Sequence, residues 1–436
     1  MKPIRIGVLG AGVVASGVVK VLARNHEEIR RRAGRHIEVA RVAARNPEKA
    51  RAALGEGVEI TTDFAAVATA PDIDIVVELM GGVDLAKQLV LKAIAAGKPV
   101  VTANKAMLAT SGQEIFQAAH DSGVSVAFEA AVAGGIPIIK ALREGLSANR
   151  IQWIAGIING TTNFILSEMR DKGLDFATVL KEAQRLGYAE ADPTFDIEGV
   201  DAAHKATIMS AIAFGVPMQF ERAHVEGITQ LQAADIRYAE EMGYRIKLLG
   251  ITRRREDGIE LRVHPTLVPA KRLIANVEGA MNAVLVQADA IGTTLYYGKG
   301  AGSEPTASAV IADLVDVTRL ITADPEHRVP HLAFRADCLA DLPVLPIGEV
   351  RTAFYLRLQV QDRPGVLASV TRILADHDIS IDAVRQLEAD EQAAHTDLII
   401  LTHETQEARM RAALSQIEAL ATVNAPVVAL RKEDLA

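Results

Sequence analysis

Short apolar runs alternate with helical patterns over the first 130 residues. The runs lie at residues 4–9, 39–44, 73–78, 99–102 and 124–128. Between them, apolar positions recur with a helical period at residues 10–32 and 85–96, and a further helix contains Phe116 and Ala119. Strands separated by helices predict right-handed crossovers and a parallel sheet that is covered on both faces.

The pattern changes after Gly135, where the apolar runs become longer and alternate with polar residues. Strands are predicted at 152–158, 247–253 and 260–265, and helices near 164–170, 175–186 and 201–214. This mixture predicts an α+β domain with a largely open sheet. Residues 305–320 form a strongly amphipathic pattern with Pro305 near its first turn, as helices tolerate. Residues 324–350 show no periodicity and are interpreted as a linker.

The last eighty residues have a pattern of their own. Phe354, Leu356, Leu358 and Val360 alternate with polar residues, as in a half-buried strand. The predicted elements that follow are a turn at 362–365, a helix at 366–377, strands at 379–386 and 396–402, a helix at 406–419 and a strand at 427–430. This order is the βαββαβ pattern of a ferredoxin-like domain.

The predicted fold class is therefore α/β, with a Rossmann-type doubly wound sheet, an α+β domain and a small C-terminal domain. The predicted boundaries are residues 1–134, with 305–322 packing back on them, then 135–304, a linker at 323–350, and 351–436. The length of 436 residues agrees with about three domains.

Composition excludes several classes of protein. With 49% hydrophobic and 23% charged residues the chain resembles an ordinary globular protein. A net charge of −8 gives no electrostatic footprint for nucleic acid. The single cysteine, Cys338, excludes an intramolecular disulfide framework and a multi-cysteine metal site. Neither an 18-residue apolar run nor a secretory N-terminus is found, so we expect a cytoplasmic protein with no membrane partner.

A glycine-rich turn follows the first predicted strand and opens a helix. Its sequence is Gly10-Ala11-Gly12-Val13-Val14-Ala15. The first glycine permits a tight turn, the second lets the backbone approach a pyrophosphate, and the last position needs only a small residue. The helix N-terminus then offers free N–H groups to phosphates. In this context the turn predicts a dinucleotide cofactor.

The end of the second strand bears on which dinucleotide is bound. NAD sites usually have a carboxylate there, but this strand runs into Arg45, and Glu38 lies at its opposite end. An arginine can pair with the 2′-phosphate of NADP, so NADP is favoured and NAD stays possible. The alternative is that Arg45 is only a solvated surface charge.

An acidic segment lies in the middle of the chain. Five carboxylates occur within twelve residues, at Glu190, Asp192, Asp196, Glu198 and Asp201. Asp201 and Lys205 are four residues apart and share one face of a predicted helix. A lysine beside a carboxylate can donate a proton to the alkoxide formed when hydride reaches a carbonyl. The other carboxylates suit a substrate ammonium group, although such a run can also be a solvated face.

Two further segments carry candidate chemistry. Lys105 follows the strand at 99–102, and the carboxyl ends of parallel strands face the ligand crevice, which places it near the nicotinamide unless it is a plain surface lysine. Residues 159–163 form a polar turn before a helix, where Thr161 or Thr162 would be the N-cap. The same helix start could hold a substrate carboxylate.

Together these segments resemble homoserine dehydrogenase over nearly the whole chain. The most specific blocks are at residues 101–105, 129–137, 160–164, 186–193, 201–205 and 297–309. The tail, with Asp362-Arg363-Pro364-Gly365, is similar to an ACT regulatory domain. The chain resembles the monofunctional form of the family, and it has Ala15 where many members have glycine.

The resemblance implies NAD(P)H-dependent reduction of aspartate 4-semialdehyde to homoserine, on the route to threonine, methionine and isoleucine. It makes Lys205 the proton donor and places Lys105 beside the cofactor. The implied homoserine-binding residues are Glu190, Asp201, Thr161, Tyr188 and Asp196. The residues implied to border the nucleotide are Gly187 and Gly302. A structural sodium ion is implied at Glu129, Val132, Gly134 and Ile136, in a turn that can present the oxygen ligands hard cations require.

The tail suggests regulation by a free amino acid such as threonine, bound at the turn of Arg363 and Gly365 between paired tails of a homodimer or homotetramer. Alternatively, the tail only dimerises. Two other functions stay open from the residues themselves: another Rossmann oxidoreductase, such as an amino-acid dehydrogenase, and a non-catalytic amino-acid sensor. The two lysines argue against the sensor.

Overall fold

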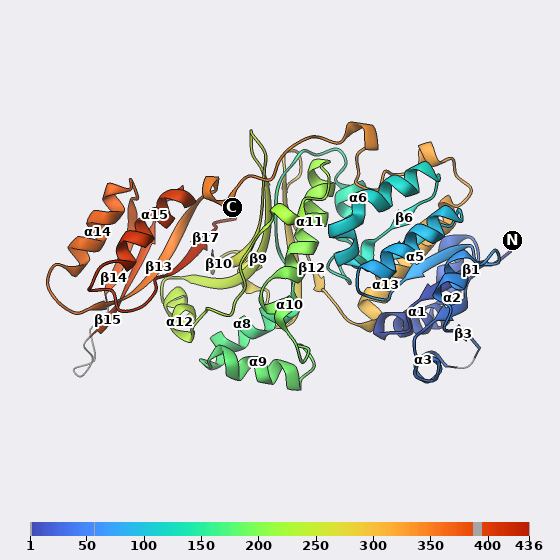
Figure 1. Ribbon diagram of the computed structural model, residues 1–436, viewed down its shortest axis with the longest axis horizontal. Helices are drawn as coiled ribbons and strands as arrows, with labels where there is room; N and C mark the ends of the chain where they lie inside the picture. The colour runs from blue at the N-terminus through green and yellow to red at the C-terminus, as the bar shows by residue number, and fades with distance from the viewer. Residues whose placement is uncertain (1, 56, 387–394, 436) are drawn as a thin grey trace. The chain divides into compact units, whose positions relative to one another are not determined.

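The computed structural model describes residues 2–55, 57–386 and 395–435 (Figure 1). The chain divides by its internal contacts into two compact units. Unit 1 comprises Met1–Gly160, Asp201–Ala223 and Ala280–Leu342, and unit 2 comprises Thr161–Val200, His224–Gly279 and Pro343–Ala436. The two units cut across the three predicted domains, whose boundaries stay a prediction.

Unit 1 contains the predicted parallel sheet, with the strand order β3-β2-β1-β4-β5-β6. Its strands are β1 (Ile4–Leu9), β2 (Ile37–Ala43), β3 (Glu59–Thr61), β4 (Ile75–Glu78), β5 (Val100–Thr102) and β6 (Val126–Ala127). The helices connecting them are α1 (Val13–Arg24), α2 (His26–Ala33), α3 (Pro47–Leu54), α4 (Phe64–Thr69), α5 (Asp84–Ala95) and α6 (Lys105–Asp121). The order reverses between β1 and β4, which is where doubly wound sheets bind their ligands.

Four elements of this sheet layer differ from the prediction. The helix predicted at 10–32 is two helices, because the backbone leaves the helical region at Asn25 with φ −108° and ψ 21°. The short strand β3 and the helices α3 and α4 were not predicted. Their signals are local caps: Asn46 and Asp63 each accept a hydrogen bond from a backbone N–H of the helix that follows.

Helix α13 (Ser303–Leu320) packs on the same sheet layer despite its distance along the chain. Its residues Ala307, Val310 and Leu314 belong to the hydrophobic core that also contains Ile6 and Val18. A Cβ atom added at Gly17 of α1 would lie 2.4 Å from the carbonyl oxygen of Ser303. The start of α13 is therefore fixed closely against α1.

The remaining strands of unit 1 are antiparallel. β11 (Met281–Ala288) pairs with β7 (Ile151–Ile157) on one side and with β12 (Gly292–Lys299) on the other. Strand β7 was predicted from the sequence, whereas β11 and β12 were not. Helix α11 (Val200–Phe214) is almost entirely buried, and the helix α7 (Ile138–Lys140) is a single short turn.

Unit 2 contains a mixed sheet and a group of helices. The long hairpin of β9 (Tyr244–Arg254) and β10 (Ile259–Pro269) is antiparallel, and β8 (His224–Val225) and β17 (Val428–Lys432) both run parallel to β10. The helices outside the C-terminal part are α8 (Gly160–Lys172), α9 (Phe176–Arg185), α10 (Thr194–Ile197) and α12 (Ala233–Glu241).

The C-terminal part of unit 2 has the predicted βαββαβ order. Its elements are β13 (Arg351–Gln361), α14 (Val366–Asp376), β14 (Ile381–Gln386), β15 (His395–Thr402), the additional short strand β16 (Thr405–Gln406), α15 (Glu407–Glu418) and β17. The alternating residues Phe354, Leu356, Leu358 and Val360 are all buried in its core, as their spacing predicts. β13 is central, because it pairs with β15 on one side and with β17 on the other.

Candidate active site

The glycine turn lies where β1 and β2 end side by side. Leu9 is the register partner of Ala43, and the N–H of Gly10 donates to the carbonyl oxygen of Ala43 at 2.9 Å. Gly10 has a φ of +103°, and a Cβ atom there would lie 2.7 Å from the carbonyl oxygen of Leu79. Both the backbone conformation and the lack of space therefore require glycine at this position.

The second glycine of the turn leaves open space instead. Gly12 is the N-cap of α1, and a Cβ atom built on it meets no atom within 4 Å. The neighbouring Val13 is 70% exposed, and Ala11 and Val14 are half-buried. A phosphate can thus approach the N–H groups at the start of α1. Ala15, in the third position of the fingerprint, is buried in the core, as its packing role predicts.

Arg45 and Glu38 lie at opposite ends of the second strand. Arg45 is exposed and follows the end of β2, whose last residue contacts Gly10. Glu38 is next to the start of β2 and forms an ion pair with Arg5 at 3.3 Å. The end of β2 that lies beside the glycine turn is therefore followed by a cationic side chain, that of Arg45.

Two lysines meet on one buried carboxylate in unit 1. Asp201 lies in the first turn of α11 and is 3% exposed. Lys205, one turn later, donates from Nζ to Asp201 Oδ2 at 2.6 Å, as the four-residue spacing predicts. Lys105, the first residue of α6, contacts Asp201 Oδ1 at 2.9 Å. The sequence singled out both lysines but gave no sign that they share a carboxylate.

The end of β7 completes this cluster. The amide Nδ2 of Asn159 donates to Asp201 Oδ2 at 2.8 Å, and the Nζ of Lys205 also donates to the carbonyl oxygen of Ile158 at 2.8 Å. Asp201 thus accepts from donors on α6, α11 and the residues after β7. Asn159 was part of the predicted polar turn, but its contact with Asp201 was not foreseen.

Electrostatics keep Asp201 ionised. Burial raises the pKa of its carboxyl, but Lys205 and Lys105 lower it by more, so the pKa lies well below its usual range. Next to it, burial is the main cause that lowers the pKa of His204 to about 4, with a smaller contribution from the two lysines. His204 packs on Phe220 at 4.3 Å between ring centroids and is neutral at pH 7.

The other predicted substrate residues lie in unit 2. The hydroxyl Oγ1 of Thr161 donates to the carbonyl oxygen of Tyr188 at 2.7 Å and to Asp196 Oδ2 at 3.3 Å. The Tyr188 ring packs on Phe164 at 4.5 Å. Glu190 is exposed, and so is Gly187, which has a φ of +78°. These contacts join the start of α8 to α10 and to the segment before it.

The N-cap predicted at Thr161 or Thr162 is wrong. Helix α8 begins at Gly160, so both threonines lie inside its first turn. The Thr161 hydroxyl contacts the acidic segment instead of a backbone N–H of its own helix.

Gly302 lies beside the glycine turn in unit 1. It is the N-cap of α13 with a φ of +124°, and the hydroxyl Oγ of the next residue, Ser303, donates to the carbonyl oxygen of Val13 at 2.8 Å. The start of α13 and the start of α1 therefore lie together.

The residues that the resemblance assigns to sodium form a tight buried turn. Both carboxylate oxygens of Glu129 accept backbone N–H groups, from Ile139 at 2.9 Å and from Lys140 at 2.8 Å. Burial raises the pKa of Glu129. Ala133 has a φ of +50°, and a Cβ atom on Gly134 would lie 2.8 Å from Thr306 Oγ1.

The fit of this turn to a cation depends on peptide oxygens. Val132, Gly134 and Ile136 can offer a cation only their carbonyl groups. Among the described residues, no cluster of three or more His, Cys, Asp or Glu side chains could hold a metal ion. A hard cation accepts carbonyl ligands, so the residues of this turn fit sodium in donor type.

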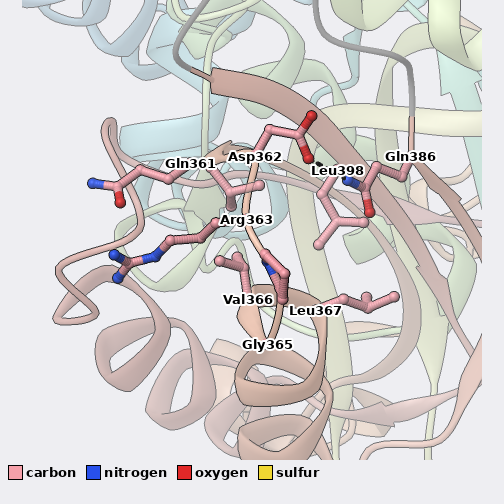
Figure 2. Close-up of a pocket in the computed structure, with 10 residues that line it drawn as sticks. Gln361, Asp362, Arg363, Gly365, Val366, Leu367, Gln386 and Leu398 are labelled. Atoms are coloured by element: carbon pink, nitrogen blue, oxygen red, sulfur yellow. Dashed lines mark hydrogen bonds between the residues drawn. The ribbon is translucent and has the colours of Figure 1, made fainter.

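The turn after β13 lines a cavity in the C-terminal part (Figure 2). Its volume is about 380 Å³, and its lining includes Arg363, Gly365 and Leu367. The Asp362 and Gln386 side chains point toward each other, and the amide of Gln386 donates to Asp362 Oδ1 at 3.3 Å. Gly365 is the N-cap of α14 with a φ of +90°.

No helix in the described ranges is long and apolar enough to cross a membrane.

Comparison with known proteins identifies the family. Residues 10–129 match the family model described as homoserine dehydrogenase, NAD binding domain, residues 137–315 match homoserine dehydrogenase, and residues 354–422 match the ACT domain. The homoserine dehydrogenase of Pseudomonas aeruginosa is 60% identical over all of both chains, and that of Neisseria gonorrhoeae is 56% identical over the same extent.

Solved structures agree with these matches. A crystal structure of a homoserine dehydrogenase from Thiobacillus denitrificans is 67% identical, with a TM-score of 0.96 over 100% of this chain and 99% of that one. A hyperthermophilic archaeal homoserine dehydrogenase in complex with NADPH is 25% identical, with a TM-score of 0.63 over 73% of this chain and 98% of that one. The glycine turn, the buried lysine–aspartate cluster and these matches lead to one conclusion: the chain belongs to the homoserine dehydrogenase family, with an NAD(P)-binding domain, a catalytic domain and a C-terminal ACT domain.

Proposed function

We propose that the chain reversibly reduces L-aspartate 4-semialdehyde to L-homoserine with NADPH, in the biosynthesis of threonine, methionine and isoleucine. The observation that carries the proposal is the shared carboxylate Asp201, which holds Lys105 and Lys205 at 2.9 and 2.6 Å. In this proposal residues 1–134 form the nucleotide-binding domain, with residues 305–322 packed on it, and residues 135–304 form the substrate-binding domain. Residues 323–350 are a linker to the regulatory domain at residues 351–436. The expected location is the cytoplasm.

Lys205 is the proposed proton donor. Its ammonium is held by Asp201 and by the carbonyl oxygen of Ile158, so its orientation is defined before substrate binds. When bound, the cofactor supplies the hydride that reduces the aldehyde carbon. Lys205 then gives its proton to the carbonyl oxygen as negative charge develops there. Lys105 adds a second cation on the other oxygen of Asp201, and we assign it to the cofactor side of the site.

Substrate binding is assigned to the acidic segment and the start of α8. The exposed carboxylate of Glu190 suits the α-ammonium group of homoserine, and Asp201 is likewise assigned to homoserine binding. Thr161 fixes the backbone of Tyr188 and contacts Asp196, which gives the segment a defined shape. The N-terminal end of α8, which is the positive end of the helix dipole, suits the substrate carboxylate.

The cofactor residues in this proposal are Gly10, Ala11, Gly12, Val13, Val14, Arg45, Lys105, Gly187 and Gly302. The open space at Gly12 and the exposed Arg45 at the edge of the turn support NADP, and the archaeal relative in complex with NADPH agrees.

The Lys205→Ala variant tests the proton donor. Without the ammonium, the alkoxide has no positioned acid, so we expect kcat for semialdehyde reduction to fall by about 10²- to 10⁴-fold. The dissociation constant for NADPH, measured by fluorescence, is the control and should stay unchanged. Full turnover in this variant would remove Lys205 from the role.

The Asp201→Asn variant adds a pH test. The lost negative charge no longer favours the Lys205 ammonium, so the pKa of Lys205 should fall. The reduction rate, which needs the protonated lysine, should then decline at a lower pH than in the native enzyme. A decline at the same pH as in the native enzyme would contradict the coupling.

The Arg45→Ala variant tests the cofactor preference. Loss of a charged hydrogen bond to the 2′-phosphate should raise KM for NADPH about tenfold and leave KM for NADH unchanged. The matched control is Arg51→Ala, because Arg51 is also exposed but lies on α3, after Arg45 in the chain. Equal KM values in Arg45→Ala and the native enzyme would make Arg45 a solvated surface charge.

A structural sodium ion is proposed at Glu129, Val132, Gly134 and Ile136. It would reinforce the turn that joins η1 (Glu129–Ala131) to α7. We expect a higher Tm in sodium chloride than in N-methylglucamine chloride at equal ionic strength, because a ligand that binds only the native state stabilises it. Gly134→Ala, whose Cβ has no room, should abolish the difference, and a persistent difference would place the cation elsewhere.

An amino-acid effector is proposed at the cavity beside Arg363 and Gly365, with threonine as the first candidate. The N-terminus of α14 and the Arg363 guanidinium suit an effector carboxylate. The enzyme is proposed to be a homodimer or homotetramer, which sedimentation measures. L-threonine should inhibit the native chain but not an Arg363→Ala variant. Equal inhibition of both would place the effector at another site.

A further inference from the structure

The last strand of the C-terminal part holds a buried guanidinium between two carboxylates. Arg431 lies in β17, and its side chain is 4% exposed. Its Nη1 and Nη2 donate to Glu226 at 2.8 and 3.0 Å, and its Nε and Nη2 donate to Glu407 at 2.8 and 2.7 Å. Both contacts use two donors each, so they fix the orientation of the partners as well as their distance.

Glu226 connects Arg431 to β8. It directly follows β8, and its backbone N–H donates to the carbonyl oxygen of Val263 at 2.8 Å. Its carboxylate also contacts His224 Nε2 at 2.7 Å. Burial raises the pKa of Glu226, but hydrogen bonds from His224 and Arg431 outweigh it, and the pKa lies well below its usual range. The pair is therefore ionised at neutral pH.

The residues that follow Glu226 contact the acidic segment. A Cβ atom on Gly227 would lie 2.3 Å from the carbonyl oxygen of Ile197, and the N–H of Ile228 donates to that same oxygen at 2.8 Å. Ile197 ends α10, the helix that includes Asp196 and through it contacts Thr161. The hydrogen bond and the close approach of the two backbones fix the position of Ile197 relative to Gly227.

Strand β17, which contains Arg431, is also connected to the proposed effector cavity beside Arg363. β17 pairs antiparallel with β13, where Phe354 is the register partner of Arg431. β13 ends at Gln361, which lines the cavity at Arg363. A continuous set of contacts thus leads from that cavity through β13, Arg431, Glu226 and Gly227 to the acidic segment.

We propose that Arg431 is a positioning residue for homoserine: through Glu226 it holds residues 187–198 in the shape that binds substrate. The inference rests on the proposed function, in which Tyr188, Glu190 and Asp196 belong to the homoserine site. Through Arg431 and Glu226, the C-terminal domain can then change the affinity for homoserine.

Glu407 provides a matched control for this role. It accepts hydrogen bonds from the same guanidinium but lies at the start of α15, so it leads back into the C-terminal part. The Glu226→Gln and Glu407→Gln variants therefore remove one charge each from the same arginine, on opposite sides. In either variant the other carboxylate still pairs with Arg431, which favours correct folding.

The first measurement is steady-state homoserine oxidation with NADP⁺. Glu226→Gln should raise KM for homoserine about tenfold, the size of a typical coupling between sites, and leave kcat and KM for NADP⁺ within about twofold. Glu407→Gln should leave all three unchanged, even if its Tm falls. Arg431→Lys should be intermediate, because an ammonium cannot hold two carboxylates with paired donors.

Hydrogen exchange gives a readout that does not require turnover. Amides of residues 187–198 should exchange faster in Glu226→Gln than in the native protein, and not in Glu407→Gln. If both variants, or neither, show faster exchange and a raised KM, the positioning role is wrong. If the native protein does not oxidise homoserine, the proposed function fails, whereas the exchange result still decides whether Arg431 holds the segment.

Discussion

The candidate active site depends on one buried carboxylate. Asp201 is 3% exposed, and an isolated charge at such a depth would be strongly unfavourable. It is stable there because Lys105, Lys205 and Asn159 all contact it. These partners come from α6, α11 and the end of β7, so the carboxylate fixes three parts of unit 1 in relation to one another. Removing one partner would leave the others with a poorly compensated buried charge.

Local patterns predicted most of the fold. The parallel sheet follows from apolar runs between helical patterns, and the C-terminal βαββαβ order follows from the alternation of Phe354, Leu356, Leu358 and Val360. The interruption at Asn25 and the strands β11 and β12 were missed. A single asparagine within a helical pattern is a weak signal, since helices tolerate it at a small cost.

The candidate site was predictable in its members but not in their contacts. Lys205 and Asp201 share a helix, so their spacing predicts the ion pair. Lys105 lies far from both along the chain, and only the folded sheet brings its Nζ to Asp201. The same holds for Arg431 and Glu226, which no sequence pattern singled out. Long-range ion pairs leave no periodic trace, because each partner satisfies the local pattern of its own element.

The two lysines have a chemical consequence beyond orientation. The Lys205 ammonium donates to Asp201 and to the carbonyl oxygen of Ile158, and Lys105 contacts the other oxygen of the same carboxylate. In the proposed reaction the ground-state aldehyde is neutral, whereas the alkoxide formed by hydride transfer is negative. Ammonium groups that are fixed in place before the reaction interact more strongly with the alkoxide than with the aldehyde, and such a difference is what lowers a barrier. The contacts that orient the proton of Lys205 therefore also hold a positive charge that favours the transition state over the ground state.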